Sequence, residues 1–196
     1  MFIFKGFLAT LGMTKAFIML KVFSFIWEIA KIVVISLAII IPIRYYLIQP
    51  FFVRGASMEP NFENGQYLVI NEIGYRFDDP ERGDVVVFKY PLDPSQYYIK
   101  RVVGLPGEKI EIKDDLIFIY NSNSPEGMKL DESNYLPEGR ITRGGINVQL
   151  NNEEYFVLGD NRSASSDSRK WGPLPKNNII GRVWLRAWPF DSAKIF

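Results

Sequence analysis

The sequence predicts a small, mainly β domain behind a single N-terminal transmembrane helix. Two contrasting parts of the chain indicate this architecture. Residues 32–53 carry one charge, Arg44, whereas the chain beyond Arg54 consists of short runs rich in Val, Ile, Phe and Tyr, separated by turn residues. This second part shows no long helical period and no internal repeat. At 196 residues the chain is long enough for one domain with its own core and a modest extra segment.

The predicted transmembrane anchor covers residues 27–49. At about 1.5 Å per residue, an apolar helix of this length reaches roughly 33 Å, close to the thickness of a hydrocarbon core. Pro50 is expected to end the helix, while Arg44 reaches the interface beside an aromatic belt of Tyr45 and Tyr46. The alternative is a buried helix in a soluble protein, but such a helix rarely needs so many Ile and Val residues in succession.

The distribution of basic residues predicts the topology. Residues 1–26 are apolar but interrupted by three lysines, so we expect this segment to be cytoplasmic or to lie at the interface. Because lysines precede the anchor and only Arg44 and Arg54 flank its far end, the positive-inside rule predicts a cytoplasmic N-terminus and an extracytoplasmic domain at 50–196. A cleavable signal peptide is the alternative, but the residues before Pro50 are too bulky for a small-residue cleavage site.

Short runs of β-forming residues define the predicted domain. They cover residues 67–70, 84–90, 97–103, 110–113, 116–120, 155–158 and 182–188. Asp114 and Asp115 separate two of these runs like the turn of a hairpin. The polar stretch at 121–145, rich in Gly, Pro and Ser, is predicted to be a surface excursion. The domain is therefore expected to be a small barrel or sandwich.

Composition excludes several kinds of chemistry. The chain has 23 Lys and Arg residues, 22 Asp and Glu residues and a net charge of +1, so no electrostatic feature indicates a nucleic-acid partner. It contains no cysteine and no histidine. Disulfides, thiolate nucleophiles, Cys- or His-ligated metals and the Ser–His–Asp triad are therefore excluded. Acid–base chemistry must use carboxylates, lysine or tyrosine, and neither a metal nor another cofactor is expected.

Two short motifs supply a candidate nucleophile and base. The first, Gly-Ala-Ser-Met-Glu-Pro, places Ser57 among small residues, which leaves the open approach that a nucleophile needs. The second places Lys100 in an apolar strand, on the same face as Tyr98 and Val102. Apolar surroundings favour the neutral amine, which can take a proton from a serine hydroxyl. Taken alone, the first motif is also typical of a linker, and the second of an edge strand whose lysine faces solvent.

A third motif, at residues 159–169, reads Gly-Asp-Asn-Arg-Ser-Ala-Ser-Ser-Asp-Ser-Arg. Hydroxyl residues alternate with opposite charges, so this loop can hold itself rigid through hydrogen bonds and an ion pair. It can then present a hydroxyl group to a neighbouring segment. The alternative is a polar surface loop without a special role.

In this order behind one anchor, the three motifs resemble the type I signal peptidases, the bacterial leader-peptidase family with a Ser–Lys dyad. The resemblance covers nearly the whole chain and includes the run Lys-Arg-Val-Val-Gly-Leu-Pro-Gly-Glu that begins at Lys100. It implies a signal-peptidase-like β fold and a membrane-anchored serine endopeptidase. Such an enzyme removes signal peptides from exported preproteins and cuts after small residues, in an Ala-x-Ala pattern.

The resemblance implies roles for the central residues of the motifs. Ser57 matches the nucleophile, Lys100 the general base, and Ser165 the serine that orients the lysine amine through a hydrogen bond. The backbone N–H of Ser57 would stabilise the oxyanion. The well-known branch of the family places a hydroxyl donor two residues before the nucleophile. This chain has Gly55 there, so the second donor stays open.

Four further residues match family positions that support the site: Asp160, Asp167, Arg169 and Arg101. Asp167 and Arg169 are expected to form an ion pair. Arg101 follows the base and is expected to face away from it, on the other side of the strand. Related enzymes of the endoplasmic reticulum have histidine where Lys100 stands, so the resemblance is to the lysine branch.

The resemblance also implies partners and a location. The partners are signal peptides of secreted preproteins, membrane lipid and, by proximity, the protein export machinery. The location is a cell membrane crossed once, with thylakoid or plastid membranes as alternatives. Two other functions stay open, namely an anchored binding protein without catalysis and a Ser–Lys peptidase that processes pilins or conjugation factors. Self-cleaving repressors share the dyad but would need a DNA-binding domain in place of the anchor.

Overall fold

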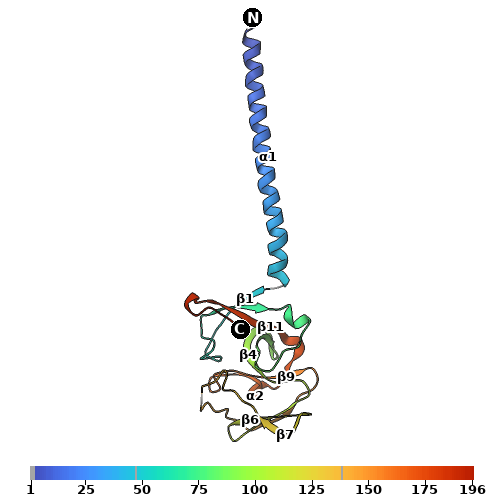
Figure 1. The fold of residues 1–196 in the computed structure, drawn as a ribbon, viewed down its shortest axis with the longest axis vertical. Coiled ribbons are helices and arrows are strands. Elements are labelled where there is room, and N and C mark those ends of the chain that lie inside the picture. The colour runs from blue at the N-terminus through green and yellow to red at the C-terminus, as the bar shows by residue number, and fades with distance from the viewer. Residues whose placement is uncertain (1–2, 47, 138) are drawn as a thin grey trace. The chain divides into compact units, whose positions relative to one another are not determined.

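The computed structural model describes residues 3–46, 48–137 and 139–196, which form two units that divide between Tyr45 and Tyr46. The described part of the first unit belongs to one continuous helix, α1 (Ile3–Tyr46) (Figure 1). Its stretch Lys21–Ile41 is long and apolar enough to cross a membrane, and the large hydrophobic side chains described there are exposed. Residues 3–26, which belong to the segment predicted to be cytoplasmic or interfacial, are therefore part of the same helix as the anchor. The interfacial roles predicted for Arg44, Tyr45 and Tyr46 concern side chains outside the described part of the structure.

The second unit is built from two antiparallel sheets (Figure 1). The larger sheet has the strand order β1-β2-β11-β3-β4-β9-β10, with β12 paired to β11. Its strands are β1 (Ile48–Phe52), β2 (Tyr67–Asn71), β3 (Val85–Tyr90), β4 (Asp93–Gly104), β9 (Glu154–Leu158), β10 (Leu174–Pro175), β11 (Ile179–Trp188) and β12 (Lys194–Ile195). The smaller sheet has the order β7-β6-β5-β8. Its strands are β5 (Lys109–Lys113), β6 (Leu116–Asn121), β7 (Ser124–Lys129) and β8 (Ile146–Gln149).

Short helical elements connect some of these strands. They are the α-helix α2 (Ser168–Trp171) and the 3-10 turns Gly74–Arg76, Lys176–Asn178 and Phe190–Ser192.

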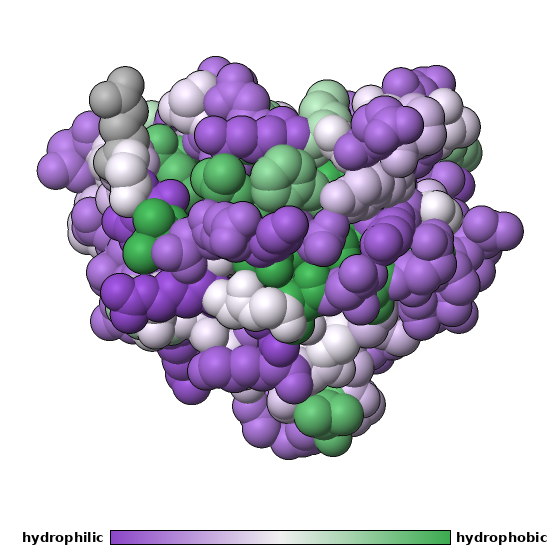
Figure 2. All heavy atoms as spheres, turned by 90° about the horizontal axis from the view of Figure 1, so that it is seen from below, coloured by the Kyte–Doolittle hydropathy of each residue, from purple (hydrophilic) through white to green (hydrophobic). Residues whose placement is uncertain are grey.

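Figure 2 shows the surface of the second unit, viewed from the end where β6 and β7 lie. This surface is mostly hydrophilic, and hydrophobic residues gather in a band across its middle.

The predicted mainly β fold is confirmed, and each predicted run corresponds to a strand, although β3 begins at Val85, one residue after the start of the run 84–90. The predicted hairpin is also confirmed, since β5 and β6 pair across Asp114 and Asp115, whose φ angles are +51° and +61°. These angles belong to the turn type that favours Asp at its centre.

Two expectations about boundaries need correction. The excursion predicted at 121–145 contains β7, which pairs with β6 and places Met128 opposite Ile119. Its sequence, Ser-Pro-Glu-Gly-Met-Lys, has no β pattern, so pairing with its neighbour determines its conformation. In addition, β1 begins at Ile48, inside the range 27–49 predicted for the anchor, and pairs with β2.

A hydrophobic cluster joins the smaller sheet to two strands of the larger one. Its buried members are Val103, Ile110, Ile112, Ile117, Ile119, Leu150, Phe156 and Leu158. Gly104 allows β4 to lie close to the side chains of Ile110 and Phe156. A Cβ at this position would lie 2.7 Å from Ile110 Cδ1 and 2.9 Å from Phe156 Cβ. The cluster holds the C-terminal part of β4 against β9. Lys100 lies within β4, and the third motif follows β9.

Candidate active site

Three segments that are distant in the sequence meet at the candidate site. β4 pairs with β9 so that Arg101 lies opposite Leu158, which places Lys100 beside the loop that follows β9. Ser57 lies in the turns after β1. The backbone N–H of Asn161, in the loop after β9, donates a hydrogen bond of 3.0 Å to the carbonyl of Ser57. The two loops are therefore bound directly to each other.

Gly159 is the closest point of contact between the two loops. A Cβ at this position would lie 2.4 Å from the carbonyl oxygen of Ser57 and 2.3 Å from the Oγ of Ser165. Any side chain would therefore force the loops apart, and only glycine fits. Gly159 thus fixes the spacing between the candidate nucleophile segment and Ser165.

The structure brings the predicted nucleophile and base into contact. The Nζ of Lys100 donates hydrogen bonds of 2.8 Å to the Oγ of Ser57 and 2.8 Å to the carbonyl of Ile99. Lys100 is only 3% exposed. Burial lowers the pKa of Lys100 to about 8, against the opposing effect of the Asp167 and Asp160 charges. A substantial neutral fraction therefore exists near pH 8, and the neutral amine can accept the Ser57 proton.

A cleft of about 640 Å³ opens beside this pair. Its lining combines aromatic residues with a run from β4: Phe51, Phe52, Arg54, Ser57, Ser95, Gln96, Tyr97, Tyr98, Ile99, Lys100 and Ser166. The ring centroid of Tyr98 lies 5.4 Å from Lys100 Nζ, and this ring stacks on Tyr90 at 4.5 Å. Tyr98 therefore lies on the same side of β4 as the amine, as strand alternation predicts.

The loop at residues 159–169 closes on itself. Asp167 accepts hydrogen bonds from Arg169 Nε (2.8 Å) and Nη2 (2.9 Å), so the predicted ion pair is present in the structure. Asp167 also accepts a hydrogen bond from the Gly159 N–H, at 3.1 Å. Arg169 Nη2 donates to the carbonyl of Arg162 at 2.6 Å, and Arg162 Nε donates to the carbonyl of Gly159 at 3.0 Å. Both peptide groups of Gly159 are thereby fixed.

The charge of Asp167 is stabilised despite its burial. Burial alone would raise the pKa of this carboxyl group. Hydrogen bonds from the Arg169 side chain, the charge of Arg169 and the Gly159 N–H outweigh that effect and lower the pKa. Asp167 is therefore an anion at neutral pH, held inside the loop.

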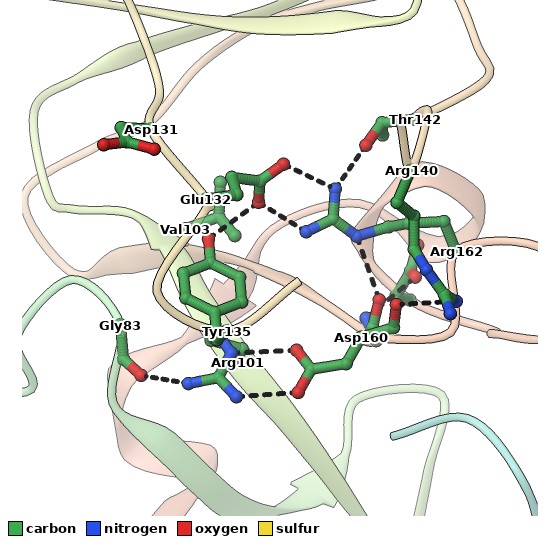
Figure 3. Close-up of polar contacts among 12 residues, drawn as sticks. Gly83, Arg101, Val103, Asp131, Glu132, Tyr135, Arg140, Thr142, Asp160 and Arg162 are labelled. Carbon is green, nitrogen blue, oxygen red and sulfur yellow. Dashed lines mark hydrogen bonds and ion pairs between the residues drawn. The ribbon is translucent and has the colours of Figure 1, made fainter. Parts of the chain in front are cut away.

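Arg101 and Asp160 form a second buried ion pair (Figure 3). Arg101 donates from Nε at 2.8 Å and from Nη2 at 2.7 Å to the two carboxylate oxygens, and from Nη1 at 2.8 Å to the carbonyl of Gly83. Asn61 Nδ2 donates to the same carboxylate at 2.8 Å. Arg101 follows Lys100 on β4, so strand alternation directs the two side chains to opposite faces. The pair links β4 to the loop after β9, on the face of β4 opposite the Lys100 amine.

The contact predicted between Ser165 and the Lys100 amine needs correction. Ser165 is 3% exposed, and its Oγ has no hydrogen-bond partner within ordinary geometry among the described residues. The hydrogen bonds of the Lys100 amine go to Ser57 and the Ile99 carbonyl. Ser165 is near the site because it packs on Gly159.

The backbone at Gly55 has an unusual conformation. Its φ of +88° lies in the left-handed region, and its N–H donates a hydrogen bond of 2.9 Å to Asn64 Oδ1. A Cβ at this position would meet no described atom within 4 Å. Glycine is therefore favoured for its backbone angle and not for lack of space.

Several residues at the site were not assigned a role from the sequence. They are Asn61, Asn64, Glu132, Tyr135, Thr142 and Arg162. Arg162 lies inside the third motif, which was the only local signal. Glu132, Tyr135 and Thr142 belong to the stretch predicted as an excursion, where polar residues are ordinary.

A buried amine bonded to a serine hydroxyl, beside an open cleft, is the arrangement of a serine hydrolase that works without histidine. The family model described as signal peptidase, peptidase S26, matches residues 26–188 of this chain. The chain therefore belongs to the signal peptidase family S26 and is a serine endopeptidase. The resemblance inferred from the motifs is confirmed.

The chain is also similar to individual proteins that are named signal peptidases. A probable signal peptidase I-2 of Synechocystis sp. is 34% identical over 168 residues, covering 83% of this chain and 73% of the relative. Signal peptidase IB of Staphylococcus aureus (strain Mu50) is 30% identical over 172 residues, covering 83% and 89%. A crystal structure of a signal peptidase I from Enterococcus faecalis V583 aligns with a TM-score of 0.44 and 28% identity, covering 54% of this chain and 97% of that one.

Proposed function

We propose that this chain is a membrane-anchored signal peptidase that removes signal peptides from exported preproteins, with Ser57 as nucleophile and Lys100 as general base. The contact of 2.8 Å between Lys100 Nζ and Ser57 Oγ is the observation that carries the proposal. Relatives named signal peptidase I support the choice of substrate.

The proposed reaction begins with proton transfer from the Ser57 hydroxyl to the neutral amine of Lys100. The Oγ then attacks the carbonyl carbon of the scissile peptide bond, and the backbone N–H of Ser57 stabilises the resulting oxyanion. The ammonium of Lys100 returns its proton to the leaving amine nitrogen as the C–N bond breaks. A water molecule, deprotonated by the same amine, hydrolyses the ester and releases the signal peptide with a new carboxylate.

Supporting residues have distinct proposed roles. Ser165 is proposed to fix the position of Gly159, against which its Oγ packs. The Asp167–Arg169 pair holds the loop that carries Ser165, and the Arg101–Asp160 pair holds that loop against β4. None of these four charged residues acts directly on the substrate in this proposal.

The proposed specificity is for small residues in an Ala-x-Ala pattern. The lining of the cleft beside Ser57 includes Phe51, Phe52, Tyr97, Tyr98 and Ile99, which offer apolar surface for such subsites. An extended peptide lying along β4 would present alternate side chains to these subsites. A shallow apolar pocket accepts a methyl group and rejects a large side chain by overpacking.

The proposed topology follows from α1. Lys21–Ile41 would cross a cell membrane once, with a cytoplasmic N-terminus and the peptidase domain, residues 50–196, on the outer side near the export machinery. Protease added to intact spheroplasts should digest this domain while cytoplasmic proteins stay intact. Full protection of the domain would contradict the topology.

Complementation tests the function as a whole. The gene should restore growth and preprotein processing to a bacterium depleted of its signal peptidase, and Ser57→Ala and Lys100→Met should not. If both variants restore growth, the chain is a binding protein and not the catalyst. If the active chain fails to process secretory preproteins but processes pilins, the substrate assignment is wrong.

A further inference from the structure

One segment leaves the smaller sheet, reaches the candidate site and returns. Leu130 N–H donates to the carbonyl of Ile117 at 2.9 Å, and Thr142 N–H donates to the carbonyl of Asp115 at 3.0 Å. Between these two anchors, Glu132 and Tyr135 contact residues of the site. We call residues 131–137 and 139–142 the buttress segment. It lies within the stretch that the sequence predicted to be a surface excursion.

Glu132 is the most constrained charge of this segment. Its Oε2 accepts a hydrogen bond of 3.0 Å from Arg162 Nη1, and its Oε1 accepts from Arg162 Nη2 and from the Tyr135 hydroxyl, the latter at 2.7 Å (Figure 3). The Arg162 and Glu132 side chains are 3% and 16% exposed. A carboxylate held at this depth by paired donors sets the orientation of the guanidinium that it binds.

Arg162 transmits this constraint to the site. Besides Glu132, its guanidinium donates to the Thr142 hydroxyl and, from Nε, to the carbonyl of Gly159 at 3.0 Å. Gly159 is the glycine that packs without spare room against the Ser57 carbonyl and Ser165. A rotation of the Arg162 guanidinium therefore displaces the residue that sets the spacing between the two loops.

Tyr135 holds the buttress segment against the other side of the site. Its carbonyl accepts a hydrogen bond of 2.6 Å from Asn61 Nδ2, which also donates to Asp160. Its ring lies under the guanidinium of Arg101, with 4.1 Å between the Arg101 Cζ and the ring centroid. The segment thus contacts the turn after Ser57, the residue after Lys100 and the loop after β9.

We propose that Glu132 is a positioning residue for peptide cleavage: through Arg162 and Gly159 it holds Ser57 at the correct distance from Lys100 and Ser165. This inference rests on the proposed roles of Ser57 and Lys100. A carboxylate is required because only two equivalent acceptor oxygens can bind both terminal nitrogens of Arg162. Glutamine keeps the size of the side chain but offers one oxygen, while aspartate keeps both oxygens on a shorter stem.

The test compares Glu132→Gln with Glu132→Asp and with a matched control elsewhere in the fold. Glu108→Gln is the control, because Glu108 also pairs with an arginine, Arg82, at 2.6 Å, and its side chain is 8% exposed. Each full-length variant is purified in detergent. The kcat and KM for a signal-peptide substrate are measured, and melting is followed by circular dichroism.

We expect Glu132→Gln to lower kcat by about tenfold or more, because misplacing a reacting group by a fraction of an ångström is enough for such a loss. Its KM should stay close to that of the wild-type protein, and Glu132→Asp should recover part of kcat. Glu108→Gln should keep kcat even where its melting temperature falls. The proposal is overturned if folded Glu132→Gln retains the wild-type kcat, or if Glu108→Gln loses as much kcat for the same loss of stability.

Ser57→Ala separates this inference from the proposed function. If Ser57→Ala still cleaves the substrate, the catalytic roles are wrong and the role of Glu132 is overturned with them. If Ser57→Ala is inactive and Glu132→Gln is fully active, only the inference about Glu132 fails.

Discussion

The Nζ of Lys100 lies 2.8 Å from the Oγ of Ser57, on a side chain that is almost completely removed from solvent. Two consequences follow from this one contact. The amine is close enough to receive the serine proton, and its burial makes the charged form costly. The same burial that activates the base should therefore also affect the stability of the folded protein.

Replacing Lys100 by arginine should abolish cleavage. Arginine keeps the positive charge but cannot lose its proton at any accessible pH, so Ser57 would lack a base. The measurement is cleavage of a signal-peptide substrate in detergent, with circular dichroism to check folding. Lys113→Arg is the control, because Lys113 is an exposed residue at the end of β5. Wild-type activity in a folded Lys100→Arg protein would rule out the dyad.

The cleavage rate should rise with pH and level off above about pH 8. The active form of Lys100 is the neutral amine, and burial lowers the pKa of this group to about 8. Below that pH the rate should change about tenfold per pH unit. Titration of a histidine cannot produce this rise in rate with pH, because the chain contains no histidine. A flat profile of kcat/KM between pH 6 and 9 would contradict the assignment of the base.

Gly159→Ala should lower kcat strongly while the protein stays folded. The added Cβ would lie 2.4 Å from the Ser57 carbonyl and 2.3 Å from Ser165 Oγ, so the two loops must separate. We expect a loss of about 100-fold in kcat, as is typical when a reacting group moves by about 1 Å. Gly145→Ala is the control, because a Cβ at Gly145 meets no described atom within 4 Å. Equal activity in the two variants would show that the contact is unimportant.

Substitutions at Gly55 should separate backbone strain from the missing hydroxyl donor. Because φ is +88°, both Gly55→Ala and Gly55→Ser should lose about 1 kcal/mol or more of folding free energy. A serine hydroxyl can donate to the oxyanion and an alanine cannot, so Gly55→Ser should turn over faster than Gly55→Ala. The measurement is kcat for both variants, with melting temperatures to confirm equal strain. Equal kcat values would mean that the hydroxyl does not reach the oxyanion.

The sequence predicted those parts of the structure whose signals are local. Alternating apolar residues marked the strands, and Ser57, Lys100 and Asp167 stood in motifs with recognisable chemistry. The other features of the fold and the site depend on contacts between different segments of the chain. The strand β7 exists because β6 lies beside it, and Glu132 is important because Arg162, 30 positions away, binds it. The close contact of Gly159 with the Ser57 carbonyl joins two motifs that lie far apart in the sequence, so neither motif alone could predict it.

Replacing Lys100 by methionine should change how stability depends on pH. Burial lowers the pKa of Lys100 in the folded protein to about 8, whereas its ordinary value is 10.5. Between these values the unfolded chain binds more protons than the folded protein, so raising the pH favours folding. Below pH 8 both states are protonated, and the buried ammonium keeps its full destabilising effect.

The wild-type protein should therefore gain up to about 3 kcal/mol relative to Lys100→Met as pH rises through this window. Other titrating groups are common to both proteins, so their contributions cancel in the difference. Melting temperatures of the two proteins, measured in the same detergent from pH 6 to 10, give this difference directly. The gap should be constant up to about pH 7 and then shift in favour of the wild-type protein. A gap that does not change with pH would show that Lys100 keeps its ordinary pKa in the fold and cannot serve as the base near neutral pH.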